Sequence, residues 1–182
     1  MDCVELTGAP PTKVSTITTP ANDPVIVIAR SFEAPRTLVW RCYTEPRHLV
    51  HFWGPKGATN PVSEVDLRVG GAWRQVMRFG AGHEYGYTSA YLEISPVERL
   101  VWRDAPEGYR FGDELPPAEM VTELTLTQTG RLTSVHVTVR FTSLLARDQA
   151  VKQGFATTVS EGSDKLDLYL FTLSATAAFQ QE

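Results

Sequence analysis

The stretch from Ala146 to Ser174 constrains the fold more than any other part of this 182-residue chain. Within it, apolar side chains recur at steps of three, four or seven residues, at Val151, Phe155, Val159, Leu166, Leu170 and Leu173. This spacing is typical of an amphipathic helix that buries one stripe. Two further apolar side chains, Leu168 and Phe171, predict that the last turns are buried on a second side as well.

Most of the chain before this helix reads as strands. The first, Val25–Phe32, is followed by two short helical segments that end at the Gly54-Pro55-Lys56-Gly57 run. Six more strands are predicted from alternating or β-branched patterns, at Val62–Leu67, Ala72–Phe79, Glu84–Ile94, Leu100–Arg103, Met120–Gln128 and Val135–Phe141. A single amphipathic helix can bury its stripe only against a sheet, so the sequence predicts an α+β two-layer fold.

The length of the chain suits one domain preceded by a tail. Residues 1–22 are rich in Thr, Pro, Ser and Ala and show no sustained period, which predicts a flexible N-terminal tail. Residues 23–178 are predicted to form a single domain. Because such a tail cannot bury enough apolar surface to offset the entropy of ordering it, we expect it to contribute little to stability.

Charge and cysteine content exclude several classes of protein. The net charge is −4 and no basic run occurs, so no nucleic-acid partner is expected. Cys3 and Cys42 are too few for a disulfide framework, and no Cys/His spacing is typical of a zinc site. His48 and His51 are interpreted as polar residues of a helix surface. We expect no metal and no cofactor.

Hydropathy argues against a membrane protein. No apolar run approaches the roughly 18 residues that a membrane span needs, and no signal peptide is recognisable. The expectation is a soluble, cytoplasmic protein, either a monomer or a homodimer.

Aromatic residues are the strongest indication of function. Trp73 and Met77 share one face of a predicted strand, three tyrosines follow at period two on the next, and Phe155, Val159 and Ser163 lie four residues apart on the helix. Together they predict an aromatic-lined pocket between helix and sheet, with tyrosine hydroxyls available for hydrogen bonds. The predicted ligand-binding residues are Trp53, Trp73, Met77, Tyr85, Tyr87, Tyr91, Trp102, Phe155, Val159 and Ser163.

No motif for nucleophilic catalysis, phosphate binding or metal hydrolysis occurs. We therefore predict no catalytic residue. The acid/base candidates near the predicted pocket wall are Arg74, His83, Glu84 and Glu93, and catalysis would need one of them inside the cavity with a shifted pKa.

A recognisable signature runs from Ala34 to Arg74. Its parts are Ala34-Pro35, Val39-Trp40, Glu45-Pro46, Phe52-Trp53-Gly54-Pro55-Lys56-Gly57, Asp66-Leu67-Arg68-Val69-Gly70-Gly71 and Trp73-Arg74. Over residues 25–174 the chain resembles the heat-shock-protein-90 ATPase activator homologues (AHSA-type), a family within the START/Bet v 1-like (SRPBCC) superfamily. Gly154-Phe155 and Asp164-Lys165-Leu166 match that family in register, whereas Ser89 and Thr158-Val159 depart from it.

The resemblance implies a helix-grip fold. In such a fold a curved seven-stranded antiparallel sheet surrounds a long C-terminal helix, with two short helices after the first strand and a cavity between helix and sheet. Superfamily members mostly bind apolar small molecules such as lipids, polyketides and other aromatics, some are cyclases or hydrolases, and eukaryotic members of the family stimulate a chaperone ATPase.

The expected function is therefore that of a cofactor-free binding protein for an apolar or aromatic small molecule. Two alternatives remain open at this point. The first is a cyclase- or hydrolase-type enzyme that uses the same cavity, and the second is a chaperone-interacting module.

Overall fold

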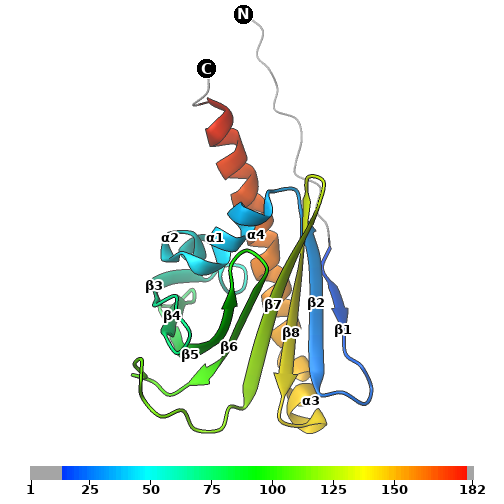
Figure 1. Ribbon diagram of the computed structural model, residues 1–182. Coiled ribbons are helices and arrows are strands. Elements are labelled where there is room, and N and C mark those ends of the chain that lie inside the picture. The colour runs from blue at the N-terminus through cyan, green and yellow to red at the C-terminus, as the bar shows by residue number, and fades with distance from the viewer. Residues whose placement is uncertain (1–13, 180–182) are drawn as a thin grey trace, which may run out of the picture.

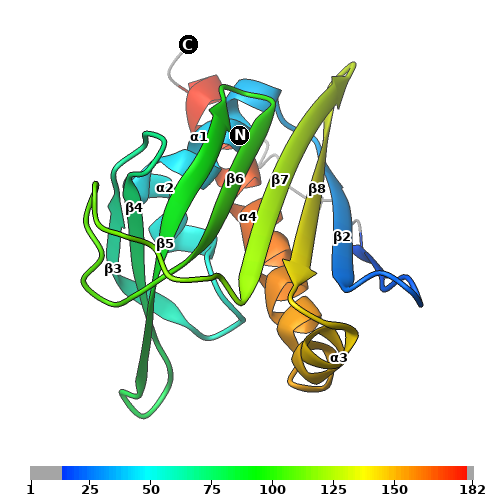
Figure 2. The ribbon, with the colours of Figure 1, turned by 60° about the horizontal axis from the view of Figure 1, so that its bottom comes forward.

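A curved sheet forms the layer against which the C-terminal helix packs. In the computed structural model, which describes residues 14–179, eight antiparallel strands form one sheet in the order β1-β2-β8-β7-β6-β5-β4-β3. Figures 1 and 2 show that the sheet curves and that the long helix α4 runs along its inner face. The strands are Thr16–Thr18 (β1), Val25–Phe32 (β2), Thr59–Val65 (β3), Ala72–Arg78 (β4), Glu84–Ser95 (β5), Arg99–Ala105 (β6), Met120–Thr129 (β7) and Leu132–Phe141 (β8).

Four helices accompany the sheet, two of them directly after β2. They are Arg36–Thr44 (α1), Pro46–Phe52 (α2), Leu144–Lys152 (α3) and Phe155–Phe179 (α4). This arrangement confirms the predicted α+β helix-grip fold, with eight strands instead of the expected seven.

The additional strand lies in the segment that was predicted to be a tail. Thr16–Thr18 pairs antiparallel with β2, with Ile17 opposite Ile28. The buried guanidinium of Arg147 also donates hydrogen bonds to the backbone carbonyl oxygens of Pro20 (2.6 Å) and Asp23 (3.0 Å). Three β-branched residues suffice to extend a free sheet edge by backbone hydrogen bonds, although they add little apolar burial. Residues 1–13 of the predicted tail lie outside the described residues.

The predicted continuous helix from Ala146 is in fact two helices. Gly154 has a φ of +81°, a left-handed conformation that ends α3 and starts a new helix at Phe155. Figure 2 shows the axis of α3 turned relative to that of α4. The periodicity of the sequence continues across this break, which is why it predicted one helix.

The buried stripe of α4 follows the predicted spacing, but its second buried side does not exist. Leu166 and Leu170 are buried, whereas Leu168 is 55% exposed and Phe171 is 49% exposed. The helix contacts α2 on one side and β2 on another, and these two elements cover only part of its circumference.

Charged residues in the middle of α4 fix the helix to its surroundings. The side chain of Arg30 in β2 is only 2% exposed and pairs with Asp164 at 2.5 Å and Asp167 at 3.0 Å. On the next residue, the Lys165 ammonium donates to carbonyl oxygens of the loop 53–58, including Trp53 at 3.2 Å. Because buried charges are stable only when paired or hydrogen-bonded, these contacts permit few other positions for the helix.

Gly71 offers a sharp test of the turn between β3 and β4. A Cβ atom at this position would lie 2.1 Å from the Asp66 carbonyl oxygen and 2.9 Å from that of Arg68, so alanine requires the backbone to move. We expect Gly71→Ala to cost about 2 kcal/mol or more, a fall in Tm of at least about 4 °C. The matched control is Gly80→Ala, since no atom lies within 4 Å of a Cβ there. Equal melting temperatures for the two variants would contradict this account of the turn.

A second test concerns β1. We expect a chain that begins at residue 23 to melt about 2–8 °C below one that begins at residue 14. The shorter chain loses the pairing of Thr16–Thr18 with β2 and one hydrogen-bond acceptor of the buried Arg147, a loss of about 1–2 kcal/mol. Thermal unfolding followed by circular dichroism measures the difference. Identical melting temperatures would show that β1 adds nothing to stability.

Candidate functional site

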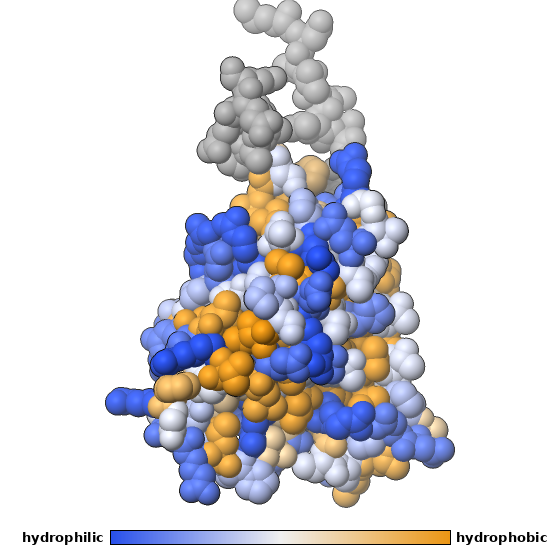
Figure 3. Space-filling view, in the orientation of Figure 1, coloured by the Kyte–Doolittle hydropathy of each residue, from blue (hydrophilic) through white to orange (hydrophobic). Residues whose placement is uncertain are grey.

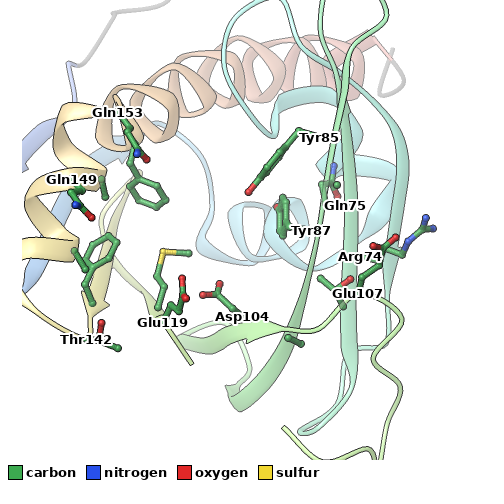
Figure 4. Close-up of a pocket in the computed structure, with 18 of the residues that line it drawn as sticks. Arg74, Gln75, Tyr85, Tyr87, Asp104, Glu107, Glu119, Thr142, Gln149 and Gln153 are labelled. Atoms are coloured by element: carbon green, nitrogen blue, oxygen red, sulfur yellow. The ribbon is translucent and has the colours of Figure 1, made fainter. Parts of the chain in front are cut away.

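A cavity of about 910 Å³ lies between the ends of the central strands and helix α3. Figure 4 shows Tyr85 and Tyr87 on one side of it, and Gln149 of α3 and Gln153, which directly follows α3, on the other. The volume falls in the range of about 300–1,000 Å³ that is typical of small-molecule pockets.

Tyr85 and Tyr87 of β5 form an aromatic wall. Behind it, the ring of Trp73 is only 1% exposed and packs edge-on against Tyr87 (5.8 Å between ring centroids), Trp53 (4.5 Å) and Trp102 (5.5 Å). Such edge-to-face packing is favourable for aromatic rings and holds them in fixed orientations. Tyr87 is therefore held in a fixed orientation, whereas Tyr85 is 57% exposed.

The Tyr87 phenol has a polar atom without a partner. Its hydroxyl oxygen is buried and has no hydrogen-bond partner of good distance and angle within the described residues, although the Trp53 indole lies near enough to act on its pKa. Burial raises the pKa of Tyr87 well above its usual value, an effect that the neighbouring Trp53 indole only partly offsets. The phenol stays neutral at any ordinary pH and can accept or donate a hydrogen bond.

A buried amide links this wall to the helical layer. Gln75, which is fully buried and also lines the cavity, donates to the Asn60 side chain at 2.7 Å and accepts from the Trp73 indole at 3.3 Å. Asn60 in turn donates to the Trp53 carbonyl oxygen at 2.9 Å. The polar chain fixes both tryptophans relative to one another.

The opposite wall depends on the break between α3 and α4. Phe155, the first residue of α4, packs edge-on against Phe141 at the end of β8, with ring centroids 6.1 Å apart. Ala146 and Ala150 contribute small side chains from α3. Because Gly154 turns α3 aside, these residues face the cavity instead of continuing the axis of α4.

Two carboxyl groups lie at one end of the cavity. Figure 4 shows the side chains of Asp104 and Glu119 next to one another, both directed toward the open space. Burial raises the pKa of Asp104 and the charge of Glu119 raises it further, while the Met120 backbone amide and Arg103 act in the opposite direction. The negative charge of ionised Asp104 is thus only partly offset by its surroundings.

Three of the ten predicted residues line this cavity: Tyr85, Tyr87 and Phe155. Another three, Trp53, Trp73 and Trp102, form the aromatic cluster behind the wall. Met77 and Tyr91 are buried in the core, and neither contributes to the lining. Val159 and Ser163 lie further along α4, and the Ser163 hydroxyl donates to the Val159 carbonyl oxygen at 3.0 Å. The cavity is thus at the start of α4, whereas the sequence placed it at the middle.

The acid/base candidates of the sequence lie mostly in ion pairs. Glu93 pairs with Arg99, and Glu84 pairs with Arg78 at 2.7 Å. Arg74 lines the cavity but its guanidinium lies 3.5 Å from Glu64.

The two histidines of α2 differ in environment. His51 is exposed, as expected for a residue of a helix surface, but His48 is buried and its Nδ1 lies 2.8 Å from the Tyr169 hydroxyl. The interpretation of His48 as a surface residue was wrong, because α4 covers that side of α2.

Asp104, Glu119, Gln75 and Phe141 were missed as cavity residues. The sequence placed the end of a strand at Arg103, whereas β6 continues to Ala105 and carries Asp104 opposite the buried Ser89. The inward position of Gln75 could have been read from the alternation of Trp73 and Met77 in β4.

The comparisons with known proteins agree with the fold. Residues 33–170 match the family described as Activator of Hsp90 ATPase homolog 1-like protein, and because this match spans most of the chain, the protein belongs to that family. No curated protein matches the chain significantly in sequence. Within the described residues no helix is long and apolar enough to cross a membrane.

Solved structures from several bacteria are similar over most of their length. A protein from Nitrosomonas europaea is 25% identical with a TM-score of 0.75, covering 86% of this chain and 99% of that one. A protein from Mycobacterium smegmatis is 23% identical with a TM-score of 0.76, over 88% and 99% of the two chains. The AHSA1 protein from Silicibacter pomeroyi is 18% identical with a TM-score of 0.63, over 81% and 98%. The similarities to the structures from Mycobacterium smegmatis and Silicibacter pomeroyi show the fold alone, because both sequences are less than 25% identical to this chain.

Asp104 should make stability depend on pH in a defined direction. Because its pKa in the folded protein is raised, the folded state binds this proton more tightly than the unfolded chain, whose Asp pKa is about 3.9. Ionised Asp104 therefore lowers stability as the pH rises through the folded-state pKa. We expect Asp104→Asn to raise Tm at pH 7 and to leave it unchanged near pH 3.

The control for this prediction is Glu114→Gln, which alters an exposed carboxylate in the loop after β6 and should change Tm at neither pH. A loss of stability in Asp104→Asn at pH 7 would mean that the carboxylate is well paired in the folded protein. Differential scanning calorimetry across this pH range gives the answer.

Proposed function

We propose that the protein binds an apolar or aromatic small molecule, such as a lipid, a polyketide or another aromatic compound, in the cavity beside α3. The observation that carries this proposal is a space of about 910 Å³ with aromatic residues on two sides, Tyr85 and Tyr87 facing Phe141 and Phe155. A ligand ring between these walls gains burial of apolar surface, at about 25 cal/mol per Å², and edge-to-face contacts of about 0.5–1.5 kcal/mol each. No cofactor is needed for such binding.

The proposal also covers the location, assembly and partners of the protein. We propose that the protein acts in the cytoplasm as a monomer or a homodimer. Its net charge of −4 and the lack of a basic run in the sequence support a function without nucleic acid.

An enzymatic alternative is favoured by one specific observation. Asp104 lies in the cavity and its pKa is raised by burial and by Glu119, as expected for a carboxyl group that donates a proton in a cyclase- or hydrolase-type reaction. Mass spectrometry of a ligand recovered after incubation distinguishes the two functions. Binding alone returns the ligand unchanged, whereas an enzyme returns a product whose formation Asp104→Asn abolishes.

A chaperone-interacting module is the remaining alternative, because the family is described by its likeness to an activator of the Hsp90 ATPase. Such a function would use an exposed apolar surface. Figure 3 shows hydrophobic residues gathered on the face over β5 and β6, where Leu92 is 42% exposed. Loss of chaperone stimulation in Leu92→Lys, with ligand binding unchanged, would support this alternative.

Filling the cavity tests the binding proposal. We expect Ala150→Phe to weaken binding of N-phenyl-1-naphthylamine, a neutral fluorescent probe, by at least about tenfold, because the larger side chain occupies the space beside Phe155. Leu145→Phe is the matched control, since Leu145 lies on the same helix and is 68% exposed. Probe fluorescence measures affinity, and the Tm of each variant shows that it is folded. Unchanged affinity in folded Ala150→Phe would place the binding site elsewhere.

A further inference from the structure

The aromatic wall and the two carboxyl groups share one cavity, and within the described residues neither carboxyl group forms an ion pair, although the charge of Arg103 acts on Asp104. We infer that the preferred ligand is an organic amine, an ammonium group attached to an apolar or aromatic body. This inference rests on the proposed binding function and specifies its ligand class.

The pairing of β6 with β7 brings the two carboxylates to the same end of these strands. Arg103 of β6 pairs with Val121 of β7, so Asp104 lies one residue before the end of β6 and Glu119 lies directly before β7. Asp104 is opposite the buried Ser89 on the inner side of the sheet. Figure 4 shows both carboxyl groups directed into the cavity. Two acceptor-only groups therefore face the same space.

The nearest guanidinium groups have other partners. Arg103 donates to the backbone carbonyl oxygens of Asp104 (3.2 Å) and Pro116. Arg74 lies 3.5 Å from Glu64, and Figure 4 shows its side chain extending away from the centre of the cavity. Neither Asp104 nor Glu119 has an ion pair in the part of the chain that the structure describes. The two carboxylates repel one another at close range, and a cation placed between them would be attracted by both.

The tyrosine wall suits the same ligand. Figure 4 shows the hydroxyl end of Tyr85 pointing into the cavity, and the buried Tyr87 hydroxyl has no hydrogen-bond partner among the described residues. Phenol oxygens accept hydrogen bonds, and the faces of tyrosine rings attract cations. An ammonium group carries three donors and no acceptor, which complements carboxylates and phenols alike. The apolar body of the ligand would then contact Phe141 and Phe155.

Three naphthalene compounds of nearly equal size separate charge from apolar binding. They are 1-naphthylmethylamine (a cation at pH 7), 1-naphthalenemethanol (neutral) and 1-naphthoic acid (an anion), and calorimetric titration gives the Kd of each. Because hydrogen bonds to charged groups are roughly twice as strong as neutral ones, we expect the amine to bind about tenfold or more tightly than the alcohol. The acid should bind more weakly than the alcohol.

The carboxylates are tested by the double variant Asp104→Asn/Glu119→Gln. We expect it to lose the preference for the amine, so that the ratio of the Kd values of the alcohol and the amine approaches one. Glu114→Gln, which removes one exposed charge outside the cavity, should keep the full preference. The Tm of each variant is measured in the same buffer.

The outcomes separate this inference from the binding proposal. If the alcohol binds and Ala150→Phe weakens it, but the amine binds no better, the ligand is not an amine although the cavity is a binding site. A preference that persists in the double variant would likewise overturn the inference, because the cation then binds elsewhere. If none of the three compounds binds, the proposed function itself fails.

Discussion

Buried and half-buried charges tie the middle of α4 to the sheet and to the loop after α2. Arg30 joins the middle of the helix to β2 through Asp164 and Asp167, and Lys165 joins it to the loop after α2. Burial raises the pKa of Asp164, but Arg30 and Lys56 outweigh this effect and hold it below its usual value. Desolvation makes such ion pairs weak sources of net stability, yet breaking one leaves an uncompensated charge, so they select a single arrangement of helix, loop and sheet. The close approach of Gly162 to the carbonyl oxygens of residues 52 and 54 belongs to the same contact.

This anchored arrangement also determines where space is left. The loop that Lys165 holds carries Trp53, whose ring packs on Trp73, so the aromatic wall is fixed from behind by the same contact that fixes the helix. Among the described residues the first turn of α4 forms no such charged contact with the sheet, and Gly154 turns α3 away from the axis of α4. The cavity therefore lies at the start of α4, whereas the middle of the helix packs against core residues.

The proposed preference for an organic amine rests on the chemistry of the cavity. An aromatic wall alone would bind many apolar molecules with little discrimination, because burial of apolar surface is not directional. The carboxyl groups of Asp104 and Glu119 add a directional, charged element, at a cost to the stability of the unliganded protein that the raised pKa of Asp104 reflects. Functional sites commonly retain groups of this kind that a purely structural core would exclude.

Patterns local to the sequence determined much of this fold. The alternation of Trp73 and Met77 placed the aromatic face of β4, the spacing of Leu166 and Leu170 placed the buried stripe of α4, and the Trp53–Gly57 signature indicated the family.

Tertiary structure alone decided the break in the C-terminal helix, the meeting of the two carboxyl groups and the first strand. The helix breaks at Gly154 because the chain must turn there, although the apolar period continues through the break. Asp104 and Glu119 lie close together because the end of β6 lies beside the start of β7, and Thr16–Thr18 is a strand because the edge of β2 is free to pair. Sequence spacing records the face of an element on which a side chain lies, but which faces meet is settled only when the elements pack.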